Sequence, residues 1–545
     1  MGDRIGMVDQ ISELPDFIIH HIMSYLSTKE AVRTCVLSKK WNHLRTSFPI
    51  LDFDEIYFVG DLAGRYSYYI DWRGKRRSYK CTDIFTRFVD ASLLRFCELK
   101  VSMQKFRLSM SDFCVEGVAS LLDKWIELAV ANEVQELDFN VATDGDSRYS
   151  LPATIFSAKF VMTLNLSGCN LEQSSDTISF HSLKKLALDR VCIGEQMVQQ
   201  FISECPLLED LILSPIWDVK RVCVSNLPKL KIVTISDENS TLESIEIVAP
   251  SLQQCTLICR DKPCLIDLAG CPHLNSLELR SVDIEILDLI SKIPLLEKLI
   301  IQGCKNLTEF EFSSDRLKDL QILECFNIDV IDVDAPNLLS FSYKCEDSLS
   351  FYSIKGSRRC ACKLKFLINT DLNGVLFFTW FKLIKEEFIG VTHQVKELSM
   401  SINIMISSDS FSLDEFRSSS PSLPREVENL IIDVQEVPPS KYAALLDCLL
   451  WVCFPRILSI ELKRRKQSTE FIKLFYEKLI NSDTKCCNSH IIKCWRHYLK
   501  GYKIESFVPY NNPKPLRADN LMVELPRLPE GTIWFQLDWC FFFTY

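Results

Sequence analysis

A proline recurs every 22 residues in the middle of this 545-residue chain, and this period constrains the fold more than any other feature. Each proline is followed two positions later by a leucine, in the pairs Pro206/Leu208, Pro228/Leu230, Pro250/Leu252, Pro272/Leu274 and Pro294/Leu296. One unit of this length cannot bury its own apolar side chains, so successive units must stack and share a continuous core. The period therefore predicts a solenoid.

Each unit also carries apolar residues at the first, fourth and sixth positions of a short segment. Segments with this pattern begin at Met103, Val134, Val161, Leu183, Leu208, Leu274, Leu296, Leu317 and Leu338. The apolar residues of each segment alternate with others, which predicts a strand with the apolar side chains inward. Gly168 and Gly303 follow such strands and are suited to the turns. The period and the spacing resemble the leucine-rich repeat (LRR), and this resemblance implies a parallel sheet.

The alternate strand positions would point outward and form the surface that a partner meets. This surface has few aromatic side chains and lacks a large patch of one charge, which suits a protein better than a phosphate-rich ligand. Nine of its residues are taken as substrate-binding candidates: Asp189, Asp210, Thr234, Thr256, Glu278, Arg280, Lys298, Gln302 and Gln321. For any single one of them, an ordinary solvated strand face is the alternative.

The repeat pattern is interrupted on both sides, which divides the chain into five predicted segments. Residues 1–50 hold three short helices, and 51–130 form a joint with irregular early repeats, including a strand at Leu51–Phe53 and helices over 83–96 and 115–130. The regular solenoid covers 131–350. The segment 351–480 carries more widely spaced strands at Val395/Leu398/Met400, Val427/Leu430/Ile432 and Ile457/Ile460/Leu462, and 481–545 forms a C-terminal cap.

Residues 12–46 divide into three short helices by their own capping signals. Pro15 is suited to a helix start, while Ser27 or Thr28 can cap the second helix and Ser38 the third. Such short helices cannot enclose this many large apolar side chains, so some of these must face a partner or the next domain. An ordinary helical cap on a larger domain would share these features.

Within the same stretch, Leu14-Pro15, Ile18, Ile22, Leu26, Ala31, the run 36–41 and Leu44 stand in an order and spacing that resemble the F-box. The resemblance implies docking on the SKP-type adaptor of an SCF (cullin–RING) ubiquitin ligase, and through it on cullin, while the rest of the chain selects the protein substrate. It assigns the adaptor interface to Leu14, Pro15, Ile18, Ile22, Leu26, Val36, Leu37 and Trp41.

The segment 351–480 resembles the FBD region that plant F-box/LRR proteins carry. The matching stretches are 395–400, 427–434, 444–451, 455–460 and 471–477. Together with the F-box and the repeats, they make the chain similar to plant F-box/LRR proteins over most of its length. The resemblance implies a plant source.

The charge and the cysteines narrow the possible partners and the compartment. A net charge of −10 argues against nucleic-acid binding, which needs a basic face. The longest apolar stretches are too short to span a bilayer, so membrane insertion is not expected. The opening MGDRIGMVDQ lacks the apolar core of a signal peptide, so the 23 cysteines are expected as reduced, buried thiols in a cytoplasmic or nuclear protein.

No catalytic residue and no cofactor are predicted, because the sequence shows no phosphate-binding glycine loop, no H-E-x-x-H and no nucleophile elbow. The cluster Cys486, Cys487, His490, Cys494 and His497 has a spacing that zinc could use on a helix. The apolar residues between its members favour a packed structural segment, and no metal site is predicted.

The expected fold class is α/β, with an N-terminal three-helix F-box followed by an LRR solenoid built on a parallel sheet. The expected function is that of a non-catalytic substrate-recognition subunit of an SCF-type ubiquitin ligase. Two alternatives stay open. One is an LRR protein-binding scaffold without a ligase role, and the other is a small-molecule-gated F-box receptor, which would need a closed apolar pocket with a basic floor.

Overall fold

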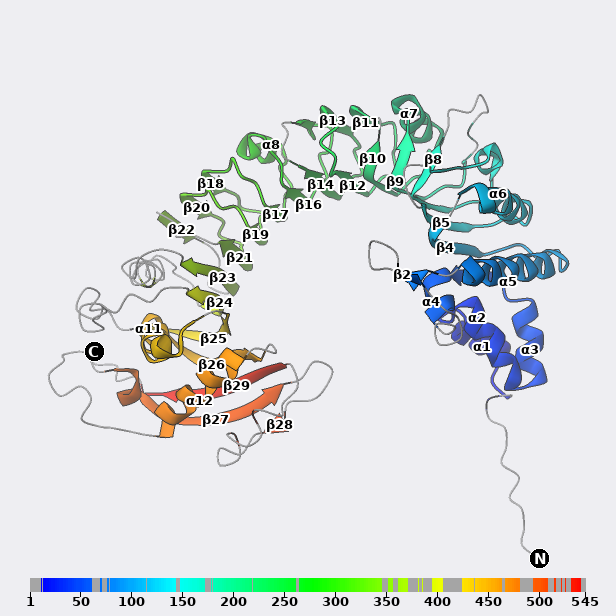
Figure 1. Cartoon of the computed structure of the whole chain (residues 1–545). Helices are drawn as coiled ribbons and strands as arrows, with labels where there is room; N and C mark the ends of the chain where they lie inside the picture. The colour runs from blue at the N-terminus through cyan, green and yellow to red at the C-terminus, as the bar shows by residue number, and fades with distance from the viewer. Residues whose placement is uncertain are drawn as a thin grey trace, which may run out of the picture. The chain divides into compact units, whose positions relative to one another are not determined.

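The computed structural model describes residues 11, 13–60, 69–70, 76–77, 79–113, 115–143, 148–171, 178, 180–217, 219–260, 264–345, 351–355, 361–370, 381, 385, 395–404, 424–435, 437–462, 466–480, 494–507, 514–515, 521, 525 and 531–540. The chain divides into two compact units. Unit 1 comprises Met1–Leu274 with Lys292–Pro294, and unit 2 comprises Asn275–Ser291 with Leu295–Tyr545. Figure 1 labels their helices and strands.

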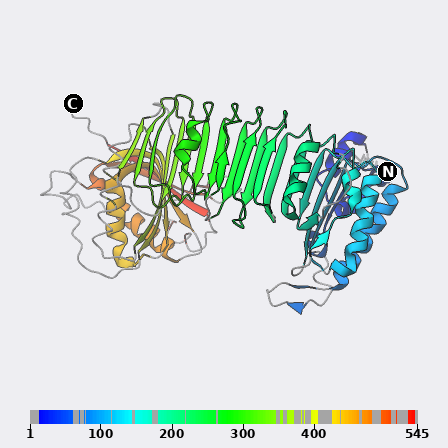
Figure 2. The same cartoon turned by 90° about the horizontal axis from the view of Figure 1, so that it is seen from above.

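Unit 1 contains a parallel sheet whose main strands pair in sequence order. They are β1 (Ile50–Asp54), β4 (Lys105–Phe113), β5 (Glu136–Thr143), β7 (Thr163–Ser167), β9 (Lys185–Ile193), β10 (Asp210–Trp217), β12 (Ile232–Asp237) and β14 (Gln254–Cys259). Figure 2 shows successive strands lying side by side, as the solenoid prediction requires. The short strands β6 (Tyr149–Ser150) and β8 (Cys169–Leu171) extend this sheet.

Two smaller groups of strands complete the β-structure described in unit 1. The strands β11 (Arg221–Ser225), β13 (Ser244–Val248) and β15 (Leu265–Asp267) form a second parallel sheet. The strands β2 (Tyr69–Ile70) and β3 (Arg76–Arg77) pair antiparallel.

The predicted inward positions of the strands are confirmed. Phe106 and Leu108 on β4, like Leu137 and Phe139 on β5, are completely buried. The strands are paired in register, so Phe106 aligns with Leu137 and Leu137 aligns with Leu164 of the next repeat. Each inward position therefore continues from strand to strand, and the stacked side chains form the core.

The prolines occupy a tight turn before each strand. The backbone nitrogen of Leu208 donates to the carbonyl oxygen of Cys205 at 3.1 Å, which places Pro206 at the second position of a four-residue turn. The same bond joins Leu230 to Leu227 at 3.3 Å and Leu252 to Ala249 at 3.0 Å. Proline is favoured at this position because its fixed φ already matches the turn, which explains the period physically.

A second recurring turn lies after the strands. Gly168 and Gly303 have φ values of +74° and +67°, as their predicted role in turns requires, and Arg190, Ser281 and Glu324 take the same left-handed conformation at 52°, 52° and 58°. In Gly303 the backbone nitrogen donates to the carbonyl oxygen of Leu323 at 2.8 Å. The left-handed residue thus bonds to the next repeat, and only glycine adopts its conformation without steric cost.

In unit 1, helices lie on the face of the first strands to which the buried side chains point. The predicted helices over 83–96 and 115–130 are confirmed as α5 (Tyr79–Cys97) and α6 (Val115–Ala131). Asp90 on α5 accepts from Lys124 Nζ at 2.7 Å and from Trp125 Nε1 at 3.1 Å, which ties the two helices together. The remaining helical segments of unit 1 are α1 (Asp16–Met23), α2 (Thr28–Arg33), η1 (Thr34–Val36), α3 (Lys39–Thr46), α4 (Glu55–Gly60), η2 (Ala153–Ser157) and α7 (Glu195–Glu204).

Unit 2 has a sheet whose strands also pair in parallel and in sequence order. They are β16 (Ser276–Arg280), β17 (Lys298–Gln302), β19 (Asp319–Leu323), β21 (Ser340–Cys345), β23 (Ala361–Thr370), β24 (Val395–Ile404), β25 (Arg425–Val434) and β26 (Cys453–Leu462). A separate parallel sheet contains β18 (Glu309–Ser313), β20 (Val330–Asp334) and β22 (Phe351–Lys355).

The direction of pairing changes at the C-terminal end of unit 2. Strand β29 (Gly531–Trp539) pairs antiparallel with both β26 and β27 (Leu499–Phe507), and β28 (Lys514–Pro515) pairs antiparallel with β27. The helical segments here are α8 (Ile286–Ser291), η3 (Pro439–Lys441), α11 (Tyr442–Val452), α12 (Lys466–Ile480) and η4 (Trp495–His497). Asp447 on α11 accepts from Trp495 Nε1 at 2.8 Å, which attaches η4 to that helix.

The structure corrects one predicted strand register in unit 2. The predicted spacing places Ile460 opposite Leu430, but Leu430 aligns with Leu458, and Ile460 aligns with Ile432. Ile460 and Leu462 are buried as predicted, whereas Ile457 is half-exposed. The sequence misled here because Ile457, Leu458 and Ile460 are all apolar, so the repeat spacing fits this run in two positions that differ by two residues.

Most of the described cysteines are buried thiols, as expected. Cys169, Cys205, Cys255 and Cys325 are examples, and all of them are free. Burial raises the pKa of the Cys169 and Cys205 thiols to about 12. These residues therefore act as small apolar side chains inside the repeats.

Candidate functional site

The three N-terminal helices begin where their capping signals predict. Pro15 precedes α1 in an extended conformation, and Ser27, rather than Thr28, is the N-cap of α2. The Ser27 side chain accepts from Glu30 N at 3.3 Å, while Ser27 N donates to the Glu30 carboxylate at 3.0 Å, forming a capping box. Ser38 caps α3 by accepting from Trp41 N at 3.3 Å.

The helices share a small core of their own. Ile19, Met23, Trp41, Leu44 and Phe48 form it, and Leu14 and Ile50 pack against it. The indole Nε1 of Trp41 donates to the carbonyl oxygen of Ile11 at 3.2 Å, and only 3% of the residue is exposed. Trp41 thus holds α3 in place, and its side chain is turned away from solvent.

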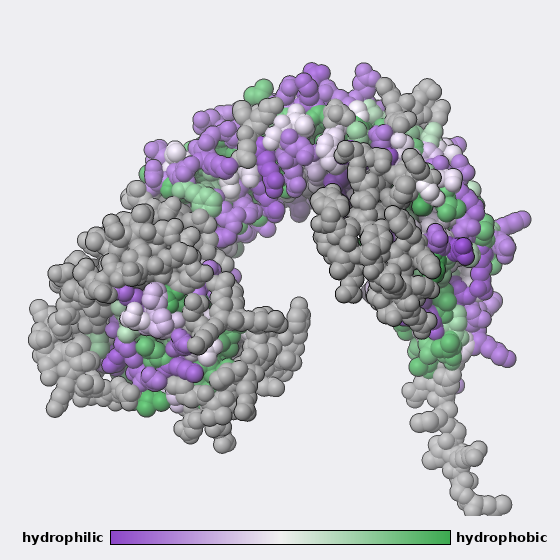
Figure 3. Space-filling view, viewed as in Figure 1, coloured by the Kyte–Doolittle hydropathy of each residue, from purple (hydrophilic) through white to green (hydrophobic). Residues whose placement is uncertain are grey.

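Large apolar side chains remain outside this core. Phe17 is 70% exposed, Tyr25 76% and Val36 88%, and Ile22 and Leu37 are also exposed. These five residues are called the apolar helix surface below. Figure 3 shows apolar, green surface at the N-terminal helices. Exposed apolar residues of this size and number in one small module mark an interaction site more often than they mark a free surface.

The eight predicted adaptor-binding residues fall into three groups. Pro15, Ile22, Val36 and Leu37 are exposed, Leu14, Ile18 and Leu26 are half-buried, and Trp41 is buried. The sequence interpretation did not include Phe17 and Tyr25. Phe17 lies on α1 opposite the buried Ile19, and its neighbourhood is so rich in apolar residues that spacing alone does not show which of them face inward.

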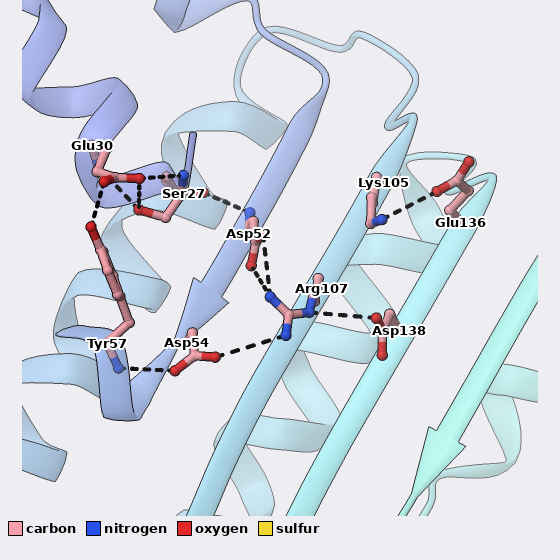
Figure 4. A network of polar contacts seen from close by, with 10 residues as sticks. Ser27, Glu30, Asp52, Asp54, Tyr57, Lys105, Arg107, Glu136 and Asp138 are labelled. Carbon is pink, nitrogen blue, oxygen red and sulfur yellow. Dashed lines mark hydrogen bonds and ion pairs between the residues drawn. The ribbon is translucent and has the colours of Figure 1, made fainter. Parts of the chain in front are cut away.

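Hydrogen bonds attach the second helix to the first strand and to α4, as Figure 4 shows in part. Thr28 Oγ1 accepts from the backbone nitrogen of Asp52 at 2.7 Å. Lys29 Nζ donates to the carbonyl oxygen of Phe58 at 2.7 Å, and the Tyr57 hydroxyl donates to the carboxylate of Glu30. Three consecutive residues of α2 are therefore fixed to the segment that begins the sheet.

One arginine continues this network across the first strands (Figure 4). Arg107 on β4 lies 3.1 Å from Asp52 and 3.8 Å from Asp54 on β1, and 3.5 Å from Asp138 on β5. Asp54 also accepts from Tyr57 N at 2.9 Å. The contacts run from the N-terminal helices through β1 to the second and third strands of the ladder, so the helices and this part of unit 1 are joined by polar contacts as well as by the chain.

Two carboxylates in the network have pKa values shifted in opposite directions. The hydrogen bond from the Tyr57 hydroxyl, followed by the one from Ser27 N, lowers the pKa of Glu30. Burial raises the pKa of Asp138, although the charge of Arg107 partly opposes this. The contacts of α2 thus favour the ionised form of Glu30.

The outward strand positions in unit 1 carry the predicted candidates Asp189, Asp210, Thr234 and Thr256. Asp189 accepts from Ser167 Oγ at 2.9 Å, and Asp210 pairs with Lys185 at 2.8 Å. Thr234 aligns with Thr256 on the next strand, in a part of the surface where the outward side chains of three strands are small or β-branched and uncharged. We call this the uncharged strand face; its members are Ile212, Ser214, Ile232, Thr234, Thr256 and Ile258.

The outward strand positions in unit 2 differ from the uncharged strand face of unit 1, because they carry charges that neutralise one another. Arg280 lies 2.5 Å from Glu278, and Lys298 lies 3.9 Å from Asp319. Gln321 Nε2 donates to Asp319 at 3.2 Å, and Gln302 Nε2 donates to Glu324 at 2.9 Å. All five predicted candidates in unit 2 are thus engaged with neighbours on the strand surface.

The cluster considered for zinc lies mostly outside the part of the chain that the structure describes. Cys486, Cys487 and His490 of the considered zinc cluster lie outside the described residues. Within the described ranges, no group of three or more metal-ligating side chains is found. The helices of those same ranges include none that is long and apolar enough to cross a membrane.

A helical module with an exposed apolar surface, joined to a solenoid of parallel strands, is typical of proteins that bind other proteins. Comparison with known families agrees. Residues 11–50 match the F-box domain, residues 122–268 match the LRR repeats of FBD-associated F-box protein At5g56370, and residues 259–367 match the LRR domain of At1g61320/AtMIF1. The predicted FBD-like region at 351–480 lies mostly beyond these matches and stays a prediction.

Relatives in Arabidopsis thaliana show the same combination in their names. The chain is 32% identical over 253 residues to F-box/LRR-repeat protein At3g59200, which is 45% of this chain and 44% of that protein. It is 29% identical over 255 residues to F-box/LRR-repeat protein At3g59190, covering 45% and 61%. The matched part spans between 37% and 61% of the length of the first relatives. The chain therefore combines an F-box match with LRR matches, and it is similar to F-box/LRR-repeat proteins of Arabidopsis thaliana over somewhat less than half of its length.

Proposed function

We propose that the chain is the substrate-recognition subunit of an SCF-type cullin–RING ubiquitin ligase. The N-terminal helices would bind an SKP-type adaptor, and the solenoid would bind the protein to be ubiquitinated. The observation that carries the proposal is the apolar helix surface: five large apolar side chains stay outside a core that is already complete. F-box proteins generally serve as such adaptors, and the match of residues 11–50 to the F-box domain supports this role.

Within this proposal the adaptor interface divides into contact and support residues. Pro15, Ile22, Val36 and Leu37 are exposed and would touch the adaptor directly, joined by Phe17 and Tyr25. The half-buried Leu14, Ile18 and Leu26 would line the edge of the same interface. Trp41 would contribute indirectly by holding α3, because its side chain is already enclosed. Anchors of this kind typically contribute about 2 kcal/mol or more each at the centre of an interface.

The uncharged strand face is the best-supported substrate surface in unit 1. Ile212 aligns with Thr234, and Thr234 aligns with Thr256, so the three strands present one continuous uncharged row. Its exposed member Ile232 is 36% accessible. Stiff β-branched side chains lose little rotamer freedom on binding, which favours association with an apolar segment of a protein. Asp189, Asp210 and Lys185 would border this surface.

The proposed role requires no catalysis by this chain. A ligase subunit that holds the substrate near a ubiquitin-charged enzyme raises the effective concentration of the reacting groups, and other subunits supply the chemistry. The solenoid and the helices would therefore act as a spacer with two binding ends. The polar network around Arg107 supports this role because it fixes the helices to the first strands.

The test is coexpression of the full chain with a plant SKP-type adaptor, followed by size-exclusion chromatography. The two proteins should elute together, and the double variant Val36→Glu/Leu37→Glu should elute alone, because it places two charges in the apolar interface. Val248→Glu is a matched control: Val248 is also an exposed valine of unit 1, 41% accessible, and lies on β13. This control should coelute fully.

Two results would contradict the proposal. If folded wild-type protein fails to bind the adaptor, the chain acts as a binding scaffold without a ligase role. If the Val36→Glu/Leu37→Glu variant binds as well as the wild type, the apolar helix surface is not the interface. Circular dichroism of each variant shows whether the helices are intact.

A further inference from the structure

A hollow lies at the C-terminal end of unit 2, away from the residues assigned above. It has a volume of about 690 Å³ and is lined by β25, β26, β27 and β29. Ile457, Gly501 and Gln536 are its half-buried lining residues, and Trp539 is buried. A volume of this size is in the range of ligand-binding clefts, roughly 300–1,000 Å³.

The β27–β29 ladder is interrupted beside the hollow. Leu499 aligns with Trp539 and Gly501 aligns with Asp538, so Lys500 is an extra residue without a partner in the register. Such a bulge redirects the side chain of the extra residue, and bulges recur beside binding sites. Gly501 adds no side chain, and a Cβ built there would lie 3.7 Å from Asp538 Oδ2. The bulge and the glycine therefore both lie in the wall of the hollow.

One wall of the hollow is held rigidly. Trp539 Nε1 donates to the carbonyl oxygen of Pro455 at 2.6 Å. The Trp539 ring stacks on Phe454 with centroids 4.6 Å apart and planes at 22°. The aromatic wall is therefore fixed before any ligand arrives, which lowers the entropy cost of binding.

The charges around the hollow balance. Arg456 and Glu426 form an ion pair at 2.8 Å on one side. Lys500 and Asp538 are both exposed on β27 and β29 and carry opposite charges. Gln536 adds an amide that can both donate and accept hydrogen bonds. A ligand with only negative groups would meet two carboxylates, and one with only positive groups would meet two cations, so both are disfavoured.

We propose that this hollow is a second protein-binding site, which takes a short peptide segment carrying an acidic and a basic side chain next to each other. The choice of a peptide rests on the proposed function, since a substrate-recognition subunit must hold a protein. Lys500 would pair with the acidic side chain of the segment and Asp538 with the basic one. Trp539 and Ile457 would pack against its aliphatic parts, and Gln536 would bond to its backbone.

The probe is an array of Gly/Ser decapeptides in which two adjacent central positions sample all pairs of Asp, Glu, Lys, Arg, Gln and Leu. The purified full chain should bind the oppositely charged pairs at least about tenfold more strongly than like-charged or neutral pairs, since tenfold corresponds to about 1.4 kcal/mol. Lys500→Glu should move the preference to two basic residues, and Asp538→Lys to two acidic ones. The double variant Lys500→Glu/Asp538→Lys should again select oppositely charged pairs.

The controls separate this site from the rest of the molecule. Lys396→Glu reverses another exposed lysine of unit 2 outside the hollow and should leave the peptide profile unchanged. Gly501→Leu places a side chain in the hollow and should abolish binding of all peptides. Adaptor coelution, measured on the same preparations, reports on the proposed ligase role independently. A peptide profile that ignores charge, or that survives both single charge reversals, overturns the proposal, as does the absence of binding to every peptide.

Discussion

Thr28 Oγ1 accepts a hydrogen bond from the backbone nitrogen of Asp52 at 2.7 Å, and so one hydroxyl joins the second N-terminal helix to the first strand of the sheet. Thr28 is 8% exposed, and Asp52 also contacts Arg107. This bond lies at the point where the proposed adaptor-binding module meets the solenoid. Its strength decides how firmly the helices are held.

Replacing Thr28 by valine keeps the shape of the side chain but removes the acceptor. The backbone nitrogen of Asp52 then loses its partner in a half-buried position, and we expect a loss of about 1–3 kcal/mol in the stability of this region. Hydrogen exchange of residues 16–54 measures it. Thr28→Ser retains the hydroxyl and should lose less; a larger loss in Thr28→Ser than in Thr28→Val would show that the methyl group, not the bond, matters.

The contact between Glu30 and Tyr57 predicts a dependence on acid. Because the folded-state pKa of Glu30 is lowered from 4.5, its ionised form contributes stability that is fully present above that value and is lost as the pH falls through the lower folded value. Tyr57→Phe should therefore weaken the N-terminal helices at pH 7, with a difference from wild type that shrinks below pH 4.5. Hydrogen exchange of both proteins between pH 3 and 7 would measure this difference.

Asp138 titrates with the opposite sign, and Tyr25 supplies the control for that experiment. Burial raises the pKa of Asp138, so its charged form costs stability and the cost disappears as the pH falls, which is the opposite sign. The Tyr57→Phe comparison cancels this contribution because Asp138 is present in both proteins. Tyr25 is 76% exposed and Tyr25→Phe is the matched control, which should leave the acid profile unchanged.

The left-handed turns predict opposite effects for two neighbouring repeats of unit 2. Gly303→Ala adds a Cβ at φ +67°, where it would lie 3.2 Å from Ser281 Oγ, and should destabilise the chain by about 1–2 kcal/mol. Ser281→Gly relieves the strain of a φ of 52° and should stabilise it by about 0.5 kcal/mol, because the added freedom of the unfolded chain offsets part of the gain. Urea midpoints of the two variants should move in opposite directions. A shared direction would show that φ does not control stability here.

The buried thiols predict a reactivity order. Burial raises the pKa of Cys169 and Cys205 to about 12, and both side chains are enclosed, whereas Cys35 and Cys223 are half-exposed. Iodoacetamide at pH 8 should label the latter two at least about tenfold faster, because the thiolate is the reacting form and needs access. Mass spectrometry of tryptic peptides over time would measure the rates. Fast labelling of Cys169 would mean that its repeat opens readily.

Much of the solenoid could be predicted because its repeat makes local and global signals agree. The inward phase of Leu137 or Leu164 follows from alternation alone, and the turn at Pro206 follows from its fixed φ. The register of β26 was wrong because Ile457, Leu458 and Ile460 are all apolar, and the repeat spacing fits that run in two positions that differ by two residues. Alternation identifies the inward residues of a strand only where polar residues occupy its outward positions.

The candidate sites were less predictable, since they depend on contacts between distant parts of the chain. Arg107 contacts Asp52 across a sequence separation of 55 residues, and spacing gives no sign of this pair. The exposure of Phe17 and the burial of Trp41 are equally hidden, because both are apolar residues in one amphipathic stretch. The hollow beside Gly501 lies at a single extra residue in a ladder, which spacing does not reveal. The sequence motifs predicted where each module lies in the chain, whereas side-chain packing determines which residues each module exposes.

The in-register pairing of the strands also governs how such a chain can change its length. Loss or gain of one residue within a strand would turn the remaining inward side chains of that strand to the other face. Loss or gain of a whole block of 22 residues, for example from Pro228 to Pro250, would bring equivalent positions back into contact. The outward row at Thr234 and Thr256 would then be shortened or extended by one step without disturbing the core. New binding surfaces can therefore arise in whole-repeat increments, while the stacking order of the leucines is inherited intact.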